Sequence, residues 1–228
     1  MLNLISKHTG CETIAMAQQE HRDFDKEAAR WDEDPRRVKL AEDVAQAIIR
    51  EARPALDMAA MDFGCGTGLV TLQIQPLVKT VTAVDSSRGM LEVLAQKIEA
   101  RKISNVVPLF IDIEKGGLLE ANNRFNLIVS SMTMHHVADT AALLRMWHQH
   151  LLPGGILSVA DLDSEDGTFH GDNTGVYHLG FGRGKLMELM RQAGFAGLKD
   201  TTASVMQRDI DGGKREFTVF LITGERTS

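Results

Sequence analysis

MDFGCGTGLVT, residues 61–71, decides the fold of this chain. Glycine recurs at every second position, as Gly64, Gly66 and Gly68, directly behind an apolar run (56–63) that contains the acidic Asp62. Glycine reaches backbone conformations closed to other residues and carries no side chain, so a ligand can lie against its backbone. The stretch therefore predicts a strand, a turn that touches a ligand, and a helix; the alternative is a tight turn without a ligand.

Apolar runs alternate with amphipathic segments on both sides of this turn. Two N-terminal helices with a break near Pro35 come first, and a further helix is expected to follow each of the first, second and fourth strands. Strands are expected at 56–63, 81–85, 106–112, 125–132 and 154–162, and helices include 69–75, the segment after Ser87, and 141–152. This alternation predicts an α/β fold, a doubly wound and mostly parallel sheet with helices on both faces.

The C-terminal part departs from this alternation of strands and helices. One more helix (186–195) is followed by two strand-like segments, 198–209 and 215–224, which flank the turn-forming residues 211–213. We expect the sheet to reach seven strands and to end in an antiparallel hairpin. The predicted organisation is a loose leader (1–15), a helical lid segment (16–54) and one domain (55–228) with a substrate-covering insertion at 163–184.

Composition limits the partners. The formal net charge is −6, from 25 basic and 31 acidic side chains, and this balance predicts no nucleic-acid partner. Two cysteines, Cys11 and Cys65, make no disulfide framework and fit a reducing compartment. The first apolar residues are too few for a signal or spanning segment, so a cytoplasmic protein without membrane insertion is expected. No pattern indicates the oligomeric state.

Glycine spacing separates two kinds of nucleoside cofactor. The dinucleotide fingerprint requires a third glycine at position 69, where this chain has Leu69. The observed spacing, with Asp62 two positions before Gly64, resembles motif I of class I S-adenosylmethionine-dependent methyltransferases, of the small-molecule, type 11-like kind. The resemblance implies a Rossmann-like sheet, S-adenosyl-L-methionine as cofactor and S-adenosyl-L-homocysteine as product.

Further positions match the same family in order. Asp85 ends the second strand, and the family's D-x-S-x-x-M pattern is met by Asp85, Ser87 and Met90. The resemblance implies that Asp85 holds the ribose hydroxyls, Asp112 takes the adenine amino group and Ile113 covers the ring. The alternative role for Asp85 is helix capping, which Ser86 and Ser87 already offer. The full set of expected cofactor contacts is Asp62, Gly64, Gly66, Gly68, Asp85, Ser86, Ser87, Met90, Asp112, Ile113, Ser130 and Trp31.

The fourth strand leads into SSMTMHHVAD, residues 130–139, which lacks the Asn/Asp-Pro-Pro-aromatic stretch of amino-group methylating relatives. His135 and His136 are candidates for a base or for substrate orientation, with a packing role as the alternative. Adjacent histidines seldom direct two ring nitrogens at one ion, so no metal site is expected. His148 and His150, in the last turn of a helix, are expected to be structural.

Two flexible segments are expected to cover the site. The insertion contains Tyr177, a third catalytic candidate, and His170, His178 and Phe181, which suit a small acceptor; a solvated Ω-loop is the alternative. In FDKEAARWDED (24–34), Phe24 and Trp31 resemble the lid anchors of small-molecule methyltransferases, although core packing would explain them equally well.

The expected function is methyl transfer from S-adenosylmethionine to a small-molecule acceptor. A cofactor-binding regulatory or carrier protein without transferase activity is the alternative, and a nicotinamide-dependent dehydrogenase is less favoured. Paired or triple cysteines are absent, which argues against a metalloid acceptor.

Overall fold

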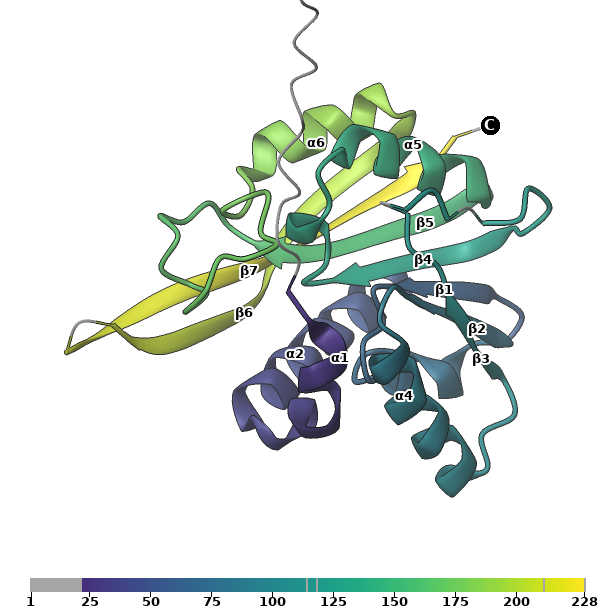
Figure 1. The fold of residues 1–228 in the computed structure, drawn as a ribbon. Coiled ribbons are helices and arrows are strands. Elements are labelled where there is room, and N and C mark those ends of the chain that lie inside the picture. The colour runs from purple at the N-terminus through teal and green to yellow at the C-terminus, as the bar shows by residue number, and fades with distance from the viewer. Residues whose placement is uncertain (1–21, 114, 118, 211, 228) are drawn as a thin grey trace, which may run out of the picture.

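Seven strands form one sheet in the order β3-β2-β1-β4-β5-β7-β6 (Figure 1). The computed structural model describes residues 22–113, 115–117, 119–210 and 212–227. The strands are β1 (Ala59–Phe63), β2 (Thr80–Asp85), β3 (Val106–Phe110), β4 (Phe125–Ser131), β5 (Leu151–Leu162), β6 (Phe195–Ile210) and β7 (Gly213–Arg226). The first five run parallel, and β7 is antiparallel to both β5 and β6. The predicted fold class is confirmed, including its C-terminal hairpin.

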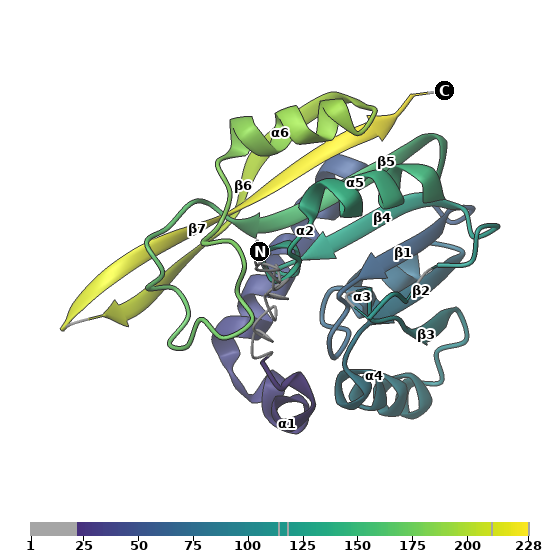
Figure 2. The same cartoon turned by 45° about the horizontal axis from the view of Figure 1, so that its top comes forward.

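Helices cover both faces of the sheet (Figure 2). The helices α2 (Pro35–Ala52), α3 (Thr71–Ile74) and α4 (Arg88–Arg101) pack on one face, and α5 (Thr140–His150) and α6 (Arg183–Gln192) on the other. A short α1 (Phe24–Glu27) precedes them, and 3-10 turns occupy η1 (Ala28–Glu33), η2 (Gln75–Leu77) and η3 (Met134–His136). The two faces bury two separate apolar cores.

The central strands are apolar on both sides because both sides are covered. Leu127 and Ile128 are neighbours on β4, so their side chains point to opposite faces, yet both are at most 1% exposed. Leu127 belongs to the core beneath α2 and α4, and Ile128 to the core beneath α5 and α6, which also contains Trp147. Continuous apolar strands of this kind are typical of parallel sheets between two helical layers.

The winding reverses between β1 and β4, which lie side by side in the centre of the sheet. Successive strands move from β1 outward to β3, and the chain then returns to β4 on the other side of β1. Ligands of doubly wound sheets lie at the carboxyl ends of the strands at such a switch point. The glycine turn follows β1 directly at this place.

Several element boundaries differ from expectation; for example, β1 begins at Ala59 instead of 56, and α6 covers Arg183–Gln192 instead of 186–195. The strand β5 begins at Leu151 instead of 154, because Leu151 pairs with Phe125. The next pair is Leu127 with Ile156, so the register irregularity between the two pairs accommodates the Pro-Gly-Gly stretch within β5. The strand β3 ends at Phe110, two residues early. The predicted first helix is a single α-turn followed by the 3-10 helix η1.

Two long features extend beyond the sheet. The β6-β7 hairpin projects past the other strands (Figure 1), and the loop 163–182 folds beside it. Backbone pairing closes the neck of this loop: Glu165 N donates to Leu179 O, and Phe181 N donates to Leu162 O. The loop is therefore anchored at its base, a feature of Ω-loops.

Residues 1–15, the expected leader, lie outside the described residues. None of the helices in the described ranges combines the length and the apolar character that crossing a membrane requires. The predicted boundaries at residues 16, 55, 163 and 184 remain predictions.

Candidate functional site

The glycine turn combines positive backbone angles with close packing. Gly64, Gly66 and Gly68 have φ values of 74°, 54° and 85°, which favour glycine. A Cβ atom on Gly64 would lie 2.1 Å from Thr133 Oγ1, and one on Gly68 would lie 2.4 Å from Leu94 Cδ1. A Cβ atom on Gly66 would meet nothing closer than the Met90 sulfur at 4.0 Å. Only Gly66 therefore faces open space, while the outer two glycines serve packing.

Asp85 connects the glycine turn to the start of α4. Its Oδ2 accepts the Gly66 N–H at 2.7 Å and its Oδ1 accepts the Ser87 N–H at 2.8 Å. Burial raises the pKa of the Asp85 carboxyl, and the hydrogen bonds from Ser87 and Gly66 oppose this shift. Each oxygen keeps lone pairs for further donors. Asp85 is thus a fixed acceptor beside the one glycine that faces open space.

Asp62 lies behind the turn. Its side chain is 1% exposed and accepts a hydrogen bond of 2.5 Å from the Thr71 hydroxyl at the start of α3. Burial raises the pKa of Asp62 to about 7. In this structure the carboxyl joins β1 to α3 and shapes the turn from within.

The predicted contact residues that follow Asp85 lie partly at the surface and partly in the core. Ser86 is exposed, whereas Ser87 caps α4 by accepting the Met90 N–H at 3.1 Å. The Met90 side chain is 2% exposed and its sulfur lies nearest to Gly66. Ser130, 1% exposed on β4, donates to the Phe63 carbonyl at 2.9 Å. These contacts support the turn; a cofactor contact remains a prediction for each of them.

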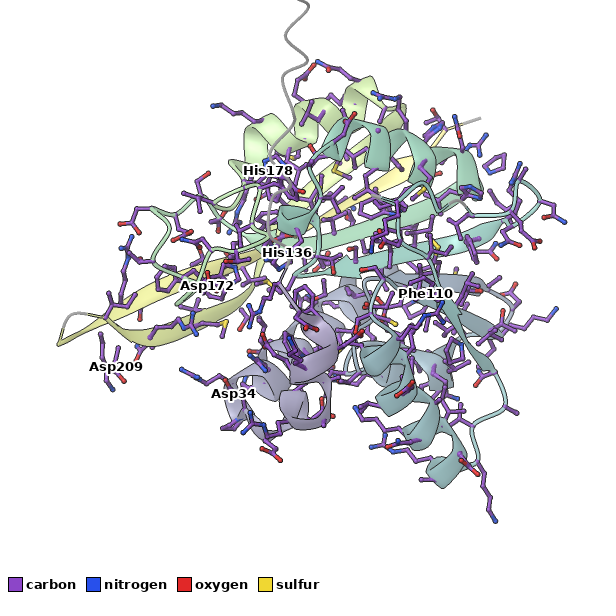
Figure 3. The ribbon with its side chains drawn as sticks, viewed as in Figure 1. Asp34, Phe110, His136, Asp172, His178 and Asp209 are labelled. Atoms are coloured by element: carbon purple, nitrogen blue, oxygen red, sulfur yellow. The ribbon has the colours of Figure 1, made fainter. Side chains whose placement is uncertain are left out.

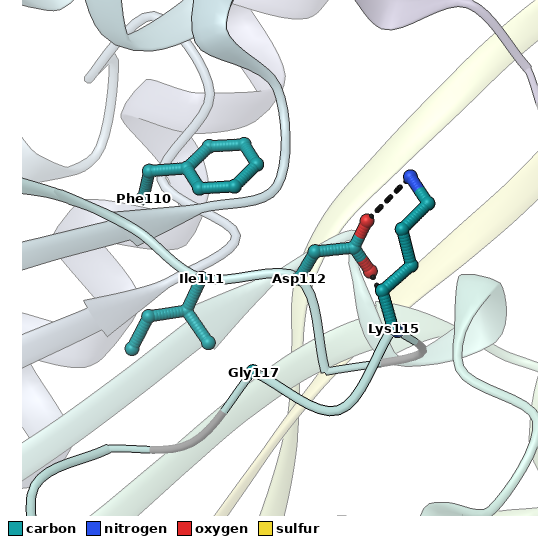
Figure 4. Close-up of a pocket in the computed structure, with 5 residues that line it drawn as sticks. All are labelled: Phe110, Ile111, Asp112, Lys115 and Gly117. Carbon is teal, nitrogen blue, oxygen red and sulfur yellow. Dashed lines mark hydrogen bonds and ion pairs between the residues drawn. The ribbon is translucent and has the colours of Figure 1, made fainter.

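An open pocket of ≈ 280 Å³ lies at the carboxyl end of β3 (Figure 4). Asp112 lines it and forms an ion pair of 2.8 Å with Lys115. Phe110, Ile111 and Gly117 complete the lining, and the guanidinium of Arg88 lies 4.0 Å from the centre of the Phe110 ring. The pocket combines a flat aromatic ring with a carboxylate. Ile113, the residue predicted to cover the ring, is partly buried and packs against the core below α5 and α6; a contact with the cofactor remains a prediction.

The N-terminal segment is attached to this region by two carboxylates. Asp25 accepts hydrogen bonds from Ser87 Oγ at 2.5 Å and from Gly89 N at 2.8 Å. Asp32 accepts one from Thr67 Oγ1 at 2.6 Å within the glycine turn, and it pairs with Lys97. The first contact places α1 on the N-terminus of α4, where a carboxylate is favoured by the helix dipole.

Aromatic contacts hold the same segment together. The rings of Phe24 and Trp31 meet edge to face with centroids 5.9 Å apart, and Arg37 stacks on Trp31 at 3.8 Å. Phe24 also contacts the His136 ring at 5.3 Å. The N-terminal segment therefore reaches from the glycine turn to the end of β4.

Three histidines gather at the end of β4. Ring centroids of His135 lie 4.1 Å from His136 and 5.1 Å from His170. His135 Nδ1 lies 2.6 Å from Asp161 Oδ1, and its backbone N–H donates to Asp161 Oδ2. His135 Nε2 is buried and has no hydrogen-bond partner among the residues that the structure describes. Asp161 thus fixes the orientation of a ring whose second nitrogen is available for a new partner.

Burial keeps the neighbouring histidines neutral. It lowers the pKa of His136 to about 4, with the charge of His135 as the next cause, and the pKa of His170 to about 3. His136 Nδ1 lies 2.7 Å from the Gly175 carbonyl, which connects β4 to the insertion. Figure 3 shows His136 between α1 and the loop that carries Asp172.

The insertion is joined to the same histidine. The backbone N–H groups of Tyr177 and His178 both donate to the His135 carbonyl, at 3.0 and 3.2 Å. His178 Nε2 lies 3.0 Å from the Val137 carbonyl, and its ring contacts Phe181 at 5.1 Å. The structure therefore brings Tyr177, His178, His170 and His135 together, although they are up to 43 residues apart in the sequence.

His148 and His150 lie away from this cluster. His148 packs edge to face on Phe195, and His150 Nδ1 lies 3.0 Å from the Asn123 carbonyl. Across the described part of the chain, no group of three or more His, Cys, Asp or Glu side chains is arranged to hold a metal ion.

Sequence reasoning missed four site residues. Asp161, Asp25 and Asp32 are single carboxylates whose partners lie far along the chain, and Phe110 resembles an ordinary strand residue. Of these residues, only Asp161 carried a sequence signal: it lies near the carboxyl end of its predicted strand, and the carboxyl ends of neighbouring parallel strands lie together at the site.

Comparisons with known proteins agree on one family. Residues 61–157 match a family model described as a methyltransferase domain. An uncharacterized methyltransferase of Schizosaccharomyces pombe is 30% identical over 149 residues, covering 60% of this chain and 52% of its own length. Trans-aconitate 2-methyltransferase of Deinococcus radiodurans is 34% identical over 128 residues, covering 55% of this chain and 45% of its own. The chain thus spans about half the length of these curated relatives.

The fold is shared more widely. Phosphoethanolamine N-methyltransferase 2 of Haemonchus contortus, solved in complex with S-adenosyl-L-methionine, superposes with a TM-score of 0.66 at 15% identity. The match covers 91% of this chain and 60% of that one. At this identity the likeness concerns the fold alone.

Proposed function

We propose that this chain, which belongs to the class I methyltransferase family, binds S-adenosyl-L-methionine at the glycine turn and transfers its methyl group to a small-molecule acceptor, leaving S-adenosyl-L-homocysteine. One observation carries the proposal. The fixed carboxylate of Asp85 lies beside Gly66, where a Cβ atom would meet nothing closer than the Met90 sulfur at 4.0 Å.

The residues present fit this cofactor. Asp85 would accept the ribose hydroxyls with its remaining lone pairs, and the backbone of Gly66 would lie against the nucleoside. The pocket formed by Phe110 and Asp112 offers a flat ring and an acceptor for the adenine, provided that Asp112 exchanges Lys115 for the amino group. When bound, the sulfonium supplies an electrophilic methyl group. Ser86, Met90, Ile113, Ser130 and Trp31 stay predicted contacts.

The chain itself must orient the nucleophile and take its proton. His135 is suited to this step, because Asp161 holds Nδ1 and leaves Nε2 without a partner. A proton taken by Nε2 would give an imidazolium stabilised by the adjacent carboxylate, the arrangement that catalytic histidines use. His136 and Tyr177 would position the acceptor, together with His170, His178 and Phe181 from the insertion.

A small molecule is the acceptor that the relatives favour. The Deinococcus relative is named for trans-aconitate, and several curated relatives are ubiquinone biosynthesis O-methyltransferases. The cysteine usage further favours a cytoplasmic location.

A second candidate is a cofactor-binding protein without transferase activity. It is favoured by the burial of His135, which is 1% exposed and covered by two other imidazole rings. It predicts cofactor affinity that does not change in Asp161→Asn and no turnover with any acceptor.

Isothermal titration of the purified chain with S-adenosylhomocysteine tests the cofactor site. Asp85→Asn loses the charge-assisted hydrogen bonds to the ribose, each worth about 1.5–3 kcal/mol, and should bind at least tenfold more weakly. Asp57→Asn, an exposed carboxylate just before β1 at the opposite end of the sheet, is the matched control. Equal affinity of Asp85→Asn and wild type would overturn the proposal, as would saturable binding of NADH in place of S-adenosylhomocysteine.

A further inference from the structure

Arg208 lies on the projecting hairpin with its guanidinium over an aromatic ring. Its central carbon is 4.9 Å from the centre of the Phe169 ring, and the side chain is partly buried. Within the described residues no carboxylate comes close enough to form an ion pair with it. An arginine removed from water in this way is costly unless an anion compensates it.

Other arginines near Arg208, in contrast, are paired with carboxylates. Arg215, opposite Arg208 in the hairpin, pairs with Asp166 at 2.7 Å. Arg36 forms two hydrogen bonds with Asp34, and Arg22 forms two of 2.7 Å with Glu27. The carboxylates of Asp34 and Glu27 are therefore already engaged.

The electrostatic surroundings of Arg208 are mostly positive. Burial lowers the pKa of Arg208, and the charges of Arg36, Arg37 and Arg22 lower it further. Asp34 is the carboxylate that acts in the opposite direction. Two exposed carboxylates are also within range of these arginines: Asp209 acts on Arg36, and Asp172 is influenced by Arg22. Figure 3 shows Asp209 on the hairpin and Asp34 at the start of α2 on facing segments. Several arginines thus gather between the hairpin and the N-terminal helices. Arg22, Arg36 and Arg37 are already paired with Glu27 or Asp34, whereas the described residues supply no ion pair for Arg208.

A row of rings connects this charge to the histidine cluster. Phe169, which carries Arg208, meets His170 at 4.8 Å, and His170 meets His135 at 5.1 Å. His170 is itself within electrostatic reach of Arg208 and Arg22. His135 and Arg208 therefore lie at the two ends of one continuous row of ring contacts.

We propose that Arg208 binds an anionic oxygen group of the methyl acceptor. The acceptor would then be a small molecule with a carboxylate or phosphate at one end and the methylated atom at the other. A guanidinium presents paired donors that match both oxyanions. This inference rests on the proposed function, because it assigns the substrate class of that same site.

The test is isothermal titration of the full chain, saturated with S-adenosylhomocysteine, with citrate and separately with inorganic phosphate at constant ionic strength. Saturable binding is expected for at least one anion, and which one binds distinguishes carboxylate from phosphate. Arg208→Gln should weaken binding at least tenfold, and Arg208→Lys should restore only part of it, because lysine cannot bind in a bidentate manner. Arg145→Gln, an exposed arginine on α5, should bind as wild type.

Two outcomes would overturn the inference: neither anion binds saturably, or Arg208→Gln binds as tightly as wild type. Titration with S-adenosylhomocysteine alone keeps the two proposals apart. Normal cofactor affinity in Arg208→Gln together with unaltered anion affinity would reject the anion site and leave the methyltransferase proposal intact. If the chain does not bind S-adenosylhomocysteine, the proposed function fails, and the same anion titrations on the unliganded chain still decide the role of Arg208.

Discussion

His135 and Asp161 form a buried pair, with Nδ1 and Oδ1 2.6 Å apart and exposed fractions of 1% and 0%. Burial alone would raise the pKa of Asp161, but the charge of His135 and its hydrogen bonds outweigh burial and lower it. A carboxyl with a lowered pKa stabilises the fold above its unfolded value of 3.8 and loses this contribution as the pH falls through the folded value.

Asp161→Asn should therefore lower the free energy of unfolding at pH 7 by about 1–3 kcal/mol. The difference from wild type should begin to shrink as the pH falls below the unfolded pKa of 3.8, and it should disappear only below the lowered pKa of the folded state. Urea denaturation at pH 7 and at a series of pH values below 4 measures this, with Asp57→Asn as the exposed control. An unchanged stability at pH 7 would show that the pair adds nothing. If His135 takes the proton, methyl transfer should also fall about 10²-fold or more with cofactor affinity retained.

Gly66 and Gly68 should respond differently to the same substitution. Gly66→Ala places a methyl group in open space and costs about 1–2 kcal/mol of backbone strain, but it should weaken S-adenosylhomocysteine binding strongly. Gly68→Ala drives its Cβ into Leu94, a fully buried core residue, and should lower the melting temperature more. Thermal denaturation and titration calorimetry separate the effects. The reverse order would mean that Gly66 does not face the ligand.

The pH dependence expected for Asp62 is opposite to that of Asp161, because the pKa of Asp62 is raised. Because its folded pKa is raised to about 7, its ionisation destabilises the fold progressively from about pH 4 to pH 7, and the loss is complete above that range. Asp62→Asn keeps an acceptor for Thr71 and avoids the buried charge. It should be more stable than wild type at pH 8 by a few kcal/mol, because the folded pKa lies well above the unfolded value of 3.8. Stability curves at pH 5 and pH 8 measure this. A variant that is less stable at pH 8 contradicts the expectation.

The N-terminal segment should detach when Asp25 is removed. Asp25→Ala deletes the acceptor of both Ser87 Oγ and Gly89 N, the contacts that join α1 to α4. Trypsin should then cleave faster after Lys26 and Arg30, as measured by mass spectrometry over time. Asp23→Ala, whose contacts are with Lys26 in the same segment, is the control. Equal cleavage rates in the two variants would assign the attachment to Asp32 and the aromatic contacts.

Cys65 should be chemically inert in the folded chain. It is 7% exposed, its sulfur faces the Gly66 carbonyl at 3.6 Å, and burial together with Asp85 and Asp62 raises its pKa well above the usual value. In a Cys11→Ser background, iodoacetamide at pH 8 should modify Cys65 only after denaturation, because the thiolate is the reactive form. Rapid modification of the native chain would show a more open glycine turn.

Local patterns predicted the fold well, because strands and helices follow from the period of apolar residues. The five parallel strands, the C-terminal hairpin and the position of Asp85 at the end of its strand were all readable from the sequence. Strand limits were less accurate: Leu151 joins β5 only because Phe125 lies beside it, and no local signal contains that pairing.

The side-chain partners of the site were not readable. Asp161 lies 26 residues from His135, Asp25 lies 62 residues from Ser87, and Arg208 lies 39 residues from Phe169. The sequence alone predicted the sheet, the glycine turn and the resemblance to a methyltransferase family, since these depend on spacing within strand-turn-helix units. Only the tertiary structure shows which glycine faces open space, which carboxylate contacts His135 and where the arginines gather, because contacts between distant segments depend on how the layers pack.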